Sequence, residues 1–220
     1  MKPRYYFILI LTLMEACLLS ELTLAAQSPI DLGLSVKWCN CNLGAANQEG
    51  FGDYYAWGEI TPKISYNWSS YKWSNGDKGV IKYSTDPEFG YNGFVDDKNS
   101  LDVVDDVAHC VLGGRWRIPS KEEWKELNEE CIWTWTTVNG VSGYVITSDK
   151  TGNSIFLPAA GGKHDTSVSE SGSRGYYWSS TLEKSYFSKY AYCFYFTWTY
   201  RTKADPQYRY YGFPIRAVTD

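Results

Sequence analysis

The chain has 220 residues, of which 44% are hydrophobic, 21% charged and 17% aromatic. These fractions exclude a disordered or collagen-like chain. The formal net charge of −4 lacks the basic excess of nucleic-acid-binding proteins, so no nucleic-acid partner is expected. The 19 Tyr, 10 Trp and 9 Phe are the unusual feature, because they either fill a core or form a binding surface.

Residues 1–26 have the pattern of an export signal, with a basic start, an apolar stretch and small residues before the expected cleavage point. A lipid anchor at Cys17 is disfavoured, because Glu15 stands where a small or apolar residue is usual. The remaining residues, 27–220, suit a single domain. We expect an exported protein, secreted or held in the cell envelope or at the cell surface, with no membrane span in the mature chain.

The first element predicted along the chain is a half-buried strand over 31–38, where apolar and polar residues alternate. A loop-rich stretch follows over 44–100. A short helix is predicted over 102–111, because its acidic residues gather at the N-terminus, where the helix dipole favours negative charge. A second helix begins after Ser120, which forms a capping box with Glu123.

After residue 131 the pattern favours strands. The expected strands cover 133–135, 143–147, 154–157, 190–200 and 213–218. A Gly/Ser-rich loop over 159–175 separates the strand at 154–157 from the strand at 190–200. The order of a strand, two short helices and then strands predicts an α+β domain.

The aromatic residues divide into an expected core and an expected surface. The first group is Trp38, Trp116, Trp124, Trp178, Phe194 and Phe196, together with Tyr192, Trp198 and Tyr200 on the even-numbered face of 190–200. The second group lies in a polar loop or beside the last strands, and comprises Trp68, Tyr71, Trp73, Tyr186, Tyr190, Tyr208, Tyr210 and Tyr211. Tyr and Trp are common in recognition surfaces, so these eight are the candidate ligand-binding residues.

Signals for catalysis are weak. His164 lies near Asp165 and Ser167 in a loop, but a lone loop histidine is usually a solvated side chain. No metal site is expected, because the cysteine spacing does not suit zinc, and the acidic run over 96–106 is partly explained by a helix start. No cofactor is expected either. An odd number of cysteines follows residue 26, so at least one thiol has no partner within the chain.

Six motifs occur in the same order as in the bacterial exported "major paralogous domain" family, which this chain resembles. They lie at 31–38, 52–59, 113–124, 131–135, 153–161 and 175–180. Residues 105–124 and 212–217 more distantly resemble the formylglycine-generating, sulfatase-modifying enzymes. This resemblance implies a C-type-lectin-like fold, with two short helices packed on small antiparallel sheets and long irregular loops. The motif positions of Cys41 and Cys131 make them the candidate disulfide pair.

The sequence therefore predicts a non-catalytic, exported surface domain that binds a glycan or a protein through Tyr/Trp-rich loops. Three alternatives stay open. The chain could be a receptor diversified by a retroelement over 176–211, an enzyme of the sulfatase-modifying type with Cys193 as its late cysteine, or a structural subunit of the envelope.

Overall fold

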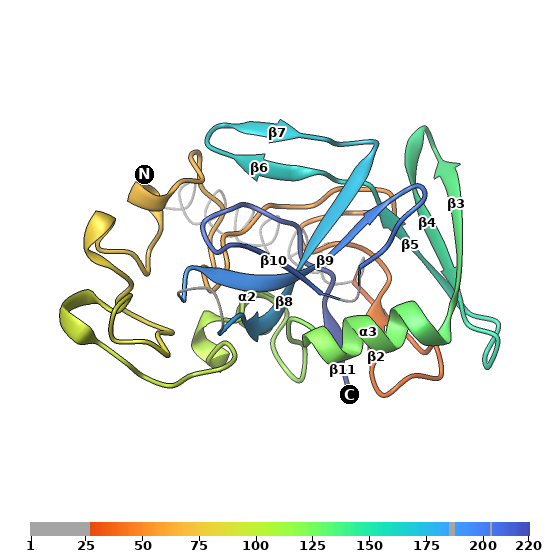
Figure 1. Cartoon of the computed structure of the whole chain (residues 1–220). Coiled ribbons are helices and arrows are strands. Elements are labelled where there is room, and N and C mark those ends of the chain that lie inside the picture. The colour runs from red at the N-terminus through yellow and green to blue at the C-terminus, as the bar shows by residue number, and fades with distance from the viewer. Residues whose placement is uncertain (1–26, 185–187, 203) are drawn as a thin grey trace, which may run out of the picture.

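The computed structural model describes residues 27–184, 188–202 and 204–220. The expected export signal, with Cys17, and the candidate Tyr186 lie outside these residues. The described chain mixes a few short helices with small antiparallel sheets, which confirms the α+β prediction (Figure 1). None of its described helices has the length and apolar character needed to cross a bilayer.

The helical elements are η1 (Trp68–Ser70), η2 (Gly76–Lys78), η3 (Tyr91–Gly93), η4 (Val103–Asp105), α2 (Val107–Leu112) and α3 (Lys121–Glu130). The strands are β1 (Pro29–Ile30), β2 (Lys37–Cys39), β3 (Ile132–Val138), β4 (Val141–Thr147), β5 (Ser154–Pro158), β6 (Gly162–His164), β7 (Ser167–Ser169), β8 (Arg174–Leu182), β9 (Tyr190–Thr197), β10 (Asp205–Tyr208) and β11 (Val218–Thr219).

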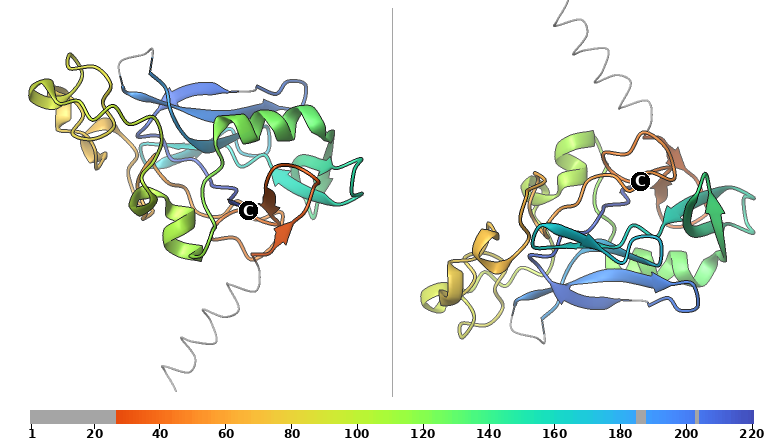
Figure 2. Two further views of the ribbon diagram at one scale, coloured as in Figure 1. Left: turned by 90° about the horizontal axis from the view of Figure 1, so that it is seen from below. Right: turned by 90° about the horizontal axis from the view of Figure 1, so that it is seen from above.

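The sheet with the order β10–β9–β8 runs through the middle of the molecule. The β3–β4–β5 sheet lies at one end and the loops between residues 60 and 100 lie at the other, as Figure 2 shows from two sides. The third three-stranded sheet, β1–β2–β11, joins the two ends of the described chain. The remaining pair, β6 and β7, forms a hairpin.

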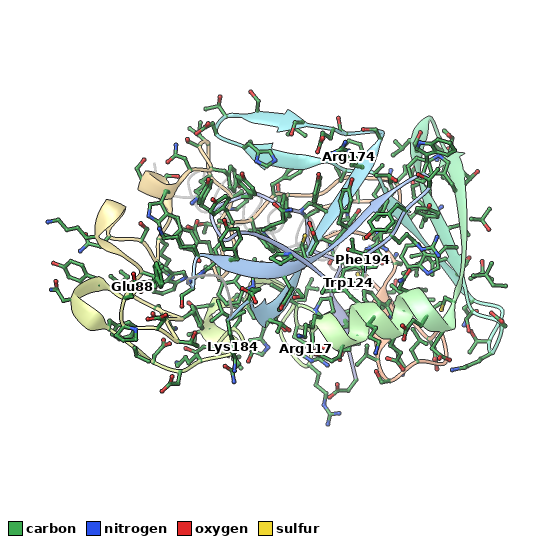
Figure 3. The ribbon with its side chains drawn as sticks, in the orientation of Figure 1. Glu88, Arg117, Trp124, Arg174, Lys184 and Phe194 are labelled. Atoms are coloured by element: carbon green, nitrogen blue, oxygen red, sulfur yellow. The ribbon has the colours of Figure 1, made fainter. Side chains whose placement is uncertain are left out.

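Strand β9 is buried on both faces and separates two hydrophobic clusters. Ala191 and Cys193 belong to one cluster, whereas Phe194 and Phe196 belong to the other. Helix α3 covers the second cluster, where the rings of Trp124 and Phe194 stack with their centroids 5.0 Å apart (Figure 3). Alternate side chains of one strand therefore supply two cores.

Tryptophan side chains stabilise an irregular part of β8. The register of β8 against β9 shifts between Trp178 and Leu182, so the carbonyl groups there need other partners. The indole of Trp124 donates to the carbonyl of Trp178 (3.2 Å), and the indole of Trp57 donates to the carbonyl of Ser179 (2.8 Å). Trp178 itself donates to the carbonyl of Tyr55 (2.8 Å), so this strand is tied to α3 and to the loop region.

The helix predictions are confirmed. Ser120 and Glu123 form both hydrogen bonds of the capping box at the start of α3. The helix predicted over 102–111 is divided into η4 and α2, because Asp106 adopts extended backbone and caps α2 by accepting from Ala108 and His109.

Three strand predictions need correction. The strand expected over 31–38 is limited to β2, because Gly33 has φ +69 and donates to Asp31 Oδ1 in a turn, although the alternating burial persists. The strand expected over 190–200 ends at Thr197, and the one over 213–218 is reduced to β11. The loop expected over 159–175 contains the β6–β7 hairpin.

We expect Trp178→Phe to lower the free energy of unfolding by about 1.5 kcal/mol. The substitution removes the indole that donates to the buried Tyr55 carbonyl, which then keeps the Phe213 amide as its donor, and the smaller ring leaves unfilled space. Trp198→Phe is the matched control, since Trp198 is 68% exposed, and it should change stability by less than about 0.5 kcal/mol. Urea unfolding followed by circular dichroism measures both. Equal effects of the two substitutions would contradict the role given to the Trp178 indole.

Candidate functional site

The structure brings together candidate residues from distant parts of the chain. Trp68 in η1 lies beside Tyr208 and Tyr210, and these three rings together with Lys189 line a pocket of about 400 Å³. We call this site the aromatic pocket. The rings are half-buried, so their edges are supported by the protein while part of each ring faces solvent.

The rings of the aromatic pocket are arranged as a continuous group. Tyr208 and Tyr210 are stacked, with centroids 5.2 Å apart and planes at 20°. Tyr190 stacks on the other side of Tyr208 at 4.4 Å, and Trp68 meets Tyr210 edge-on at 5.8 Å. Tyr211 packs edge-on against Tyr210 at 4.8 Å. Such contacts hold each ring in a defined orientation before any ligand arrives.

The local sequence fixes Trp68. Asn67 caps η1 and forms a capping box with Ser70. The indole of Trp68 donates to the carbonyl of Gly76 at 2.8 Å, and Gly76 has φ +57, a conformation that suits glycine. The indole nitrogen is therefore already bonded to the protein, and Trp68 contributes mainly the surface of its ring.

Arg209 holds the residues of the aromatic pocket in place from the protein interior. It is fully buried, whereas its neighbours Tyr208 and Tyr210 are half-buried and line the pocket. Its guanidinium donates to Tyr71 Oη (2.9 Å) and to the carbonyls of Ser188 (2.7 Å), Tyr83 (3.2 Å) and Lys82 (3.0 Å). One side chain thus joins the end of β10 to the loops that carry Trp68. The sequence analysis missed it, because a single arginine between tyrosines has no distinctive spacing.

Comparison of the chain with protein-family models, with curated proteins and with solved structures gives no match.

Two other candidate residues, Tyr71 and Trp73, do not line the aromatic pocket. Tyr71 was expected on the surface, but it is only 2% exposed, because its hydroxyl donates to the carbonyl of Trp57 and accepts from Arg209. Burial raises its pKa well above the usual range. Trp73 is half-buried and donates to the carbonyl of Gly58, outside the aromatic pocket.

The core prediction holds for Trp38, Trp124, Trp178, Phe194 and Phe196, which are all buried. It is wrong for Trp198 and Tyr200, which are 68% and 58% exposed. Strand β9 ends before them, and the Thr197 amide donates to the Tyr200 carbonyl in a tight turn that directs both rings outward. Tyr192 and Trp116, also expected in the core, are half-buried, and so is the surface candidate Tyr190.

The groups considered for catalysis are occupied by other contacts. The ring of His164 packs against Tyr211 with centroids 4.0 Å apart, and the Asp165 carboxylate accepts from Asn67. Cys193 is buried, and burial raises the pKa of its thiol well above the ordinary value, which disfavours a thiolate nucleophile.

The acidic run also has structural partners. Asp96 accepts from the amides of Tyr83 and Ser84, and Asp106 caps α2. Asp102 and Asp105 form ion pairs with Lys82 at 2.6 and 2.5 Å. These carboxylates are used in holding the loop region to α2.

The candidate disulfide is not formed. Cys41 is buried in the cluster on one face of β9, whereas Cys131 packs against the cluster on the other face. No disulfide joins any cysteines of the described residues. Cys131 directly follows α3 as its C-cap, and the β8–β9 layer separates the two clusters.

Arg209→Lys is expected to lower the free energy of unfolding by about 3 kcal/mol, because a single ammonium cannot satisfy all four acceptors that the guanidinium reaches. Arg174→Lys is the matched control, because Arg174 is largely exposed and pairs with Glu170. Chemical unfolding of both variants tests this, and a loss below about 1 kcal/mol at Arg209 would rule out the anchoring role.

His164 should make stability depend on pH. Burial lowers the pKa of its imidazole, although Glu170 and Asp165 act in the opposite direction. The unfolded chain therefore binds a proton at a pH where the folded chain does not, and stability should fall as the pH drops below about 6.5. His164→Asn should reduce the loss of stability between pH 7.5 and pH 5.5, measured by urea unfolding. An unchanged pH dependence would show that His164 is not its source.

Proposed function

We propose that the chain is an exported, non-catalytic domain that binds a saccharide at the aromatic pocket. The observation that carries this proposal is the convergence of Trp68, Tyr208 and Tyr210 around one pocket. Aromatic faces bind the apolar faces of sugar rings, while phenolic hydroxyls bond to sugar hydroxyls. Rings held in place by Arg209 and by each other lose little entropy on binding.

The resemblance to the "major paralogous domain" family supports an exported location, and the more distant resemblance to the formylglycine-generating enzymes supports a C-type-lectin-like fold. The two short helices, the small antiparallel sheets and the long loops between β2 and α2 are compatible with that fold. We extend the proposal to this fold on the motifs and on these features together.

The alternatives fit the structure less well. A receptor diversified over 176–211 needs exposed variable positions, whereas Tyr177, Trp178 and Phe194 are fully buried. A sulfatase-modifying activity would depend on the buried Cys193. A purely structural subunit gives no reason for an aromatic pocket open to solvent.

We expect a screen of the 27–220 protein on an oligosaccharide array to give a ligand, whose affinity is then measured by titration calorimetry. Trp68→Ala should weaken its binding about tenfold, which corresponds to about 1.4 kcal/mol. Trp198→Ala is the matched control, because it removes an exposed indole outside the pocket.

If Trp198→Ala weakens binding and Trp68→Ala does not, the ligand binds the turn after β9 and the aromatic pocket is not the site. If the protein binds no saccharide, the proposed function is wrong.

A further inference from the structure

Lys189 gives the aromatic pocket a positive charge. It is the charged residue among those that line the pocket, and its ammonium lies 5.9 Å from the centroids of both the Trp68 and the Phe89 rings. Among the side chains that the structure describes, no carboxylate lies within ion-pair distance of it. Within this part of the structure, the pocket therefore contains a cation without an acidic partner.

The other cations near these rings are already engaged. Lys63 pairs with Glu59 at 2.8 Å, and Lys82 pairs with Asp102 and Asp105. Arg209 directs its guanidinium at the Tyr71 hydroxyl and backbone carbonyls. Lys163 donates to the carbonyl of Lys63 at 3.5 Å. Lys189 differs from all of these in facing the pocket without such a contact.

The acidic groups nearby do not neutralise Lys189. Asp165 acts on Tyr210 electrostatically, but its carboxylate already accepts from Asn67 at 3.0 Å. Glu88 precedes Phe89 in the chain and is exposed (Figure 3). Burying Lys189 under a neutral ligand would therefore cost free energy, whereas an anionic ligand would offset that cost.

The tyrosines near Lys189 add no negative charge to the pocket. Burial and the neighbouring Tyr208 raise the pKa of Tyr190 to about 12, and burial raises that of Tyr210 above the usual range. These phenols therefore keep their protons at neutral pH and do not repel a negative charge.

We infer that the aromatic pocket takes an acidic saccharide, with sugar rings against Trp68 and Tyr210 and a carboxylate or sulfate group beside Lys189. This inference rests on the proposed function and specifies its ligand class.

The test compares matched saccharides on the 27–220 protein by titration calorimetry. One pair is a hexagalacturonate and the same oligosaccharide with its carboxylates reduced to hydroxymethyl groups. The other is a sulfated chondroitin oligosaccharide and its desulfated form. At least one acidic member should bind about tenfold more tightly than its partner, and added salt should reduce the difference. The pair that shows the difference identifies the anionic group.

The variants assign the effect to one side chain. Lys189→Gln should abolish most of the acidic preference, and Lys189→Arg should restore it. Lys184→Gln is the matched control, because Lys184 is exposed and does not line the pocket (Figure 3). The urea unfolding curve of each variant verifies that it folds.

The outcomes separate the two proposals. Equal binding of acidic and reduced members, or a preference that survives in Lys189→Gln, overturns the acidic-ligand inference and leaves saccharide binding intact. Binding of neither kind of saccharide overturns both.

Discussion

Three indole hydrogen bonds around Trp178 and Ser179 are the contacts on which the rest of the structure depends. Strand β8 loses its regular pairing with β9 at this point, which leaves buried carbonyl groups in need of donors. Trp124 brings α3 to one of these carbonyls and Trp57 brings the loop region to the next. The irregular stretch of β8 thus fixes where the helix and the loops sit relative to the central sheet.

This arrangement explains why the chain contains so many aromatic residues without a correspondingly large binding surface. Many of the rings fill the two clusters on either face of β8 and β9. A tryptophan can fill space in such a cluster and also donate one hydrogen bond, which an aliphatic side chain cannot do. Trp124 and Trp178 each perform both tasks.

Local signals in the sequence were sufficient for the helices and for the strands β3, β4 and β5, whereas β8 was not predicted. The capping box of Ser120 and Glu123 involves residues three positions apart, so it could be predicted without knowledge of the fold. The alternation of apolar and polar residues over 31–38 predicted a continuous strand, which is wrong. Burial does alternate there, but Gly33 turns the backbone. The end of β9 at Thr197 depends on the turn that follows it. The even-numbered pattern of the expected strand does not reveal this turn, so it wrongly placed Trp198 and Tyr200 in the core.

The candidate site was partly accessible from sequence. Position in a polar loop or beside a strand selected Trp68, Tyr208 and Tyr210 as candidates, because such places are usually solvated, and the structure places these three rings around one pocket. The roles of Arg209 and Lys189 could not be predicted, since each depends on neighbours 100 or more residues away in the chain. The burial of Tyr71 has the same cause, because it follows from the contact with Arg209.

The alternation of Tyr208, Arg209 and Tyr210 has a consequence for substitutions. The arginine points into the protein and holds the loops, while the two tyrosines line the pocket. Under the proposed function, stability and ligand choice therefore depend on adjacent but separate positions. Substitution of the outer rings would then change the ligand while the inner guanidinium keeps the same scaffold.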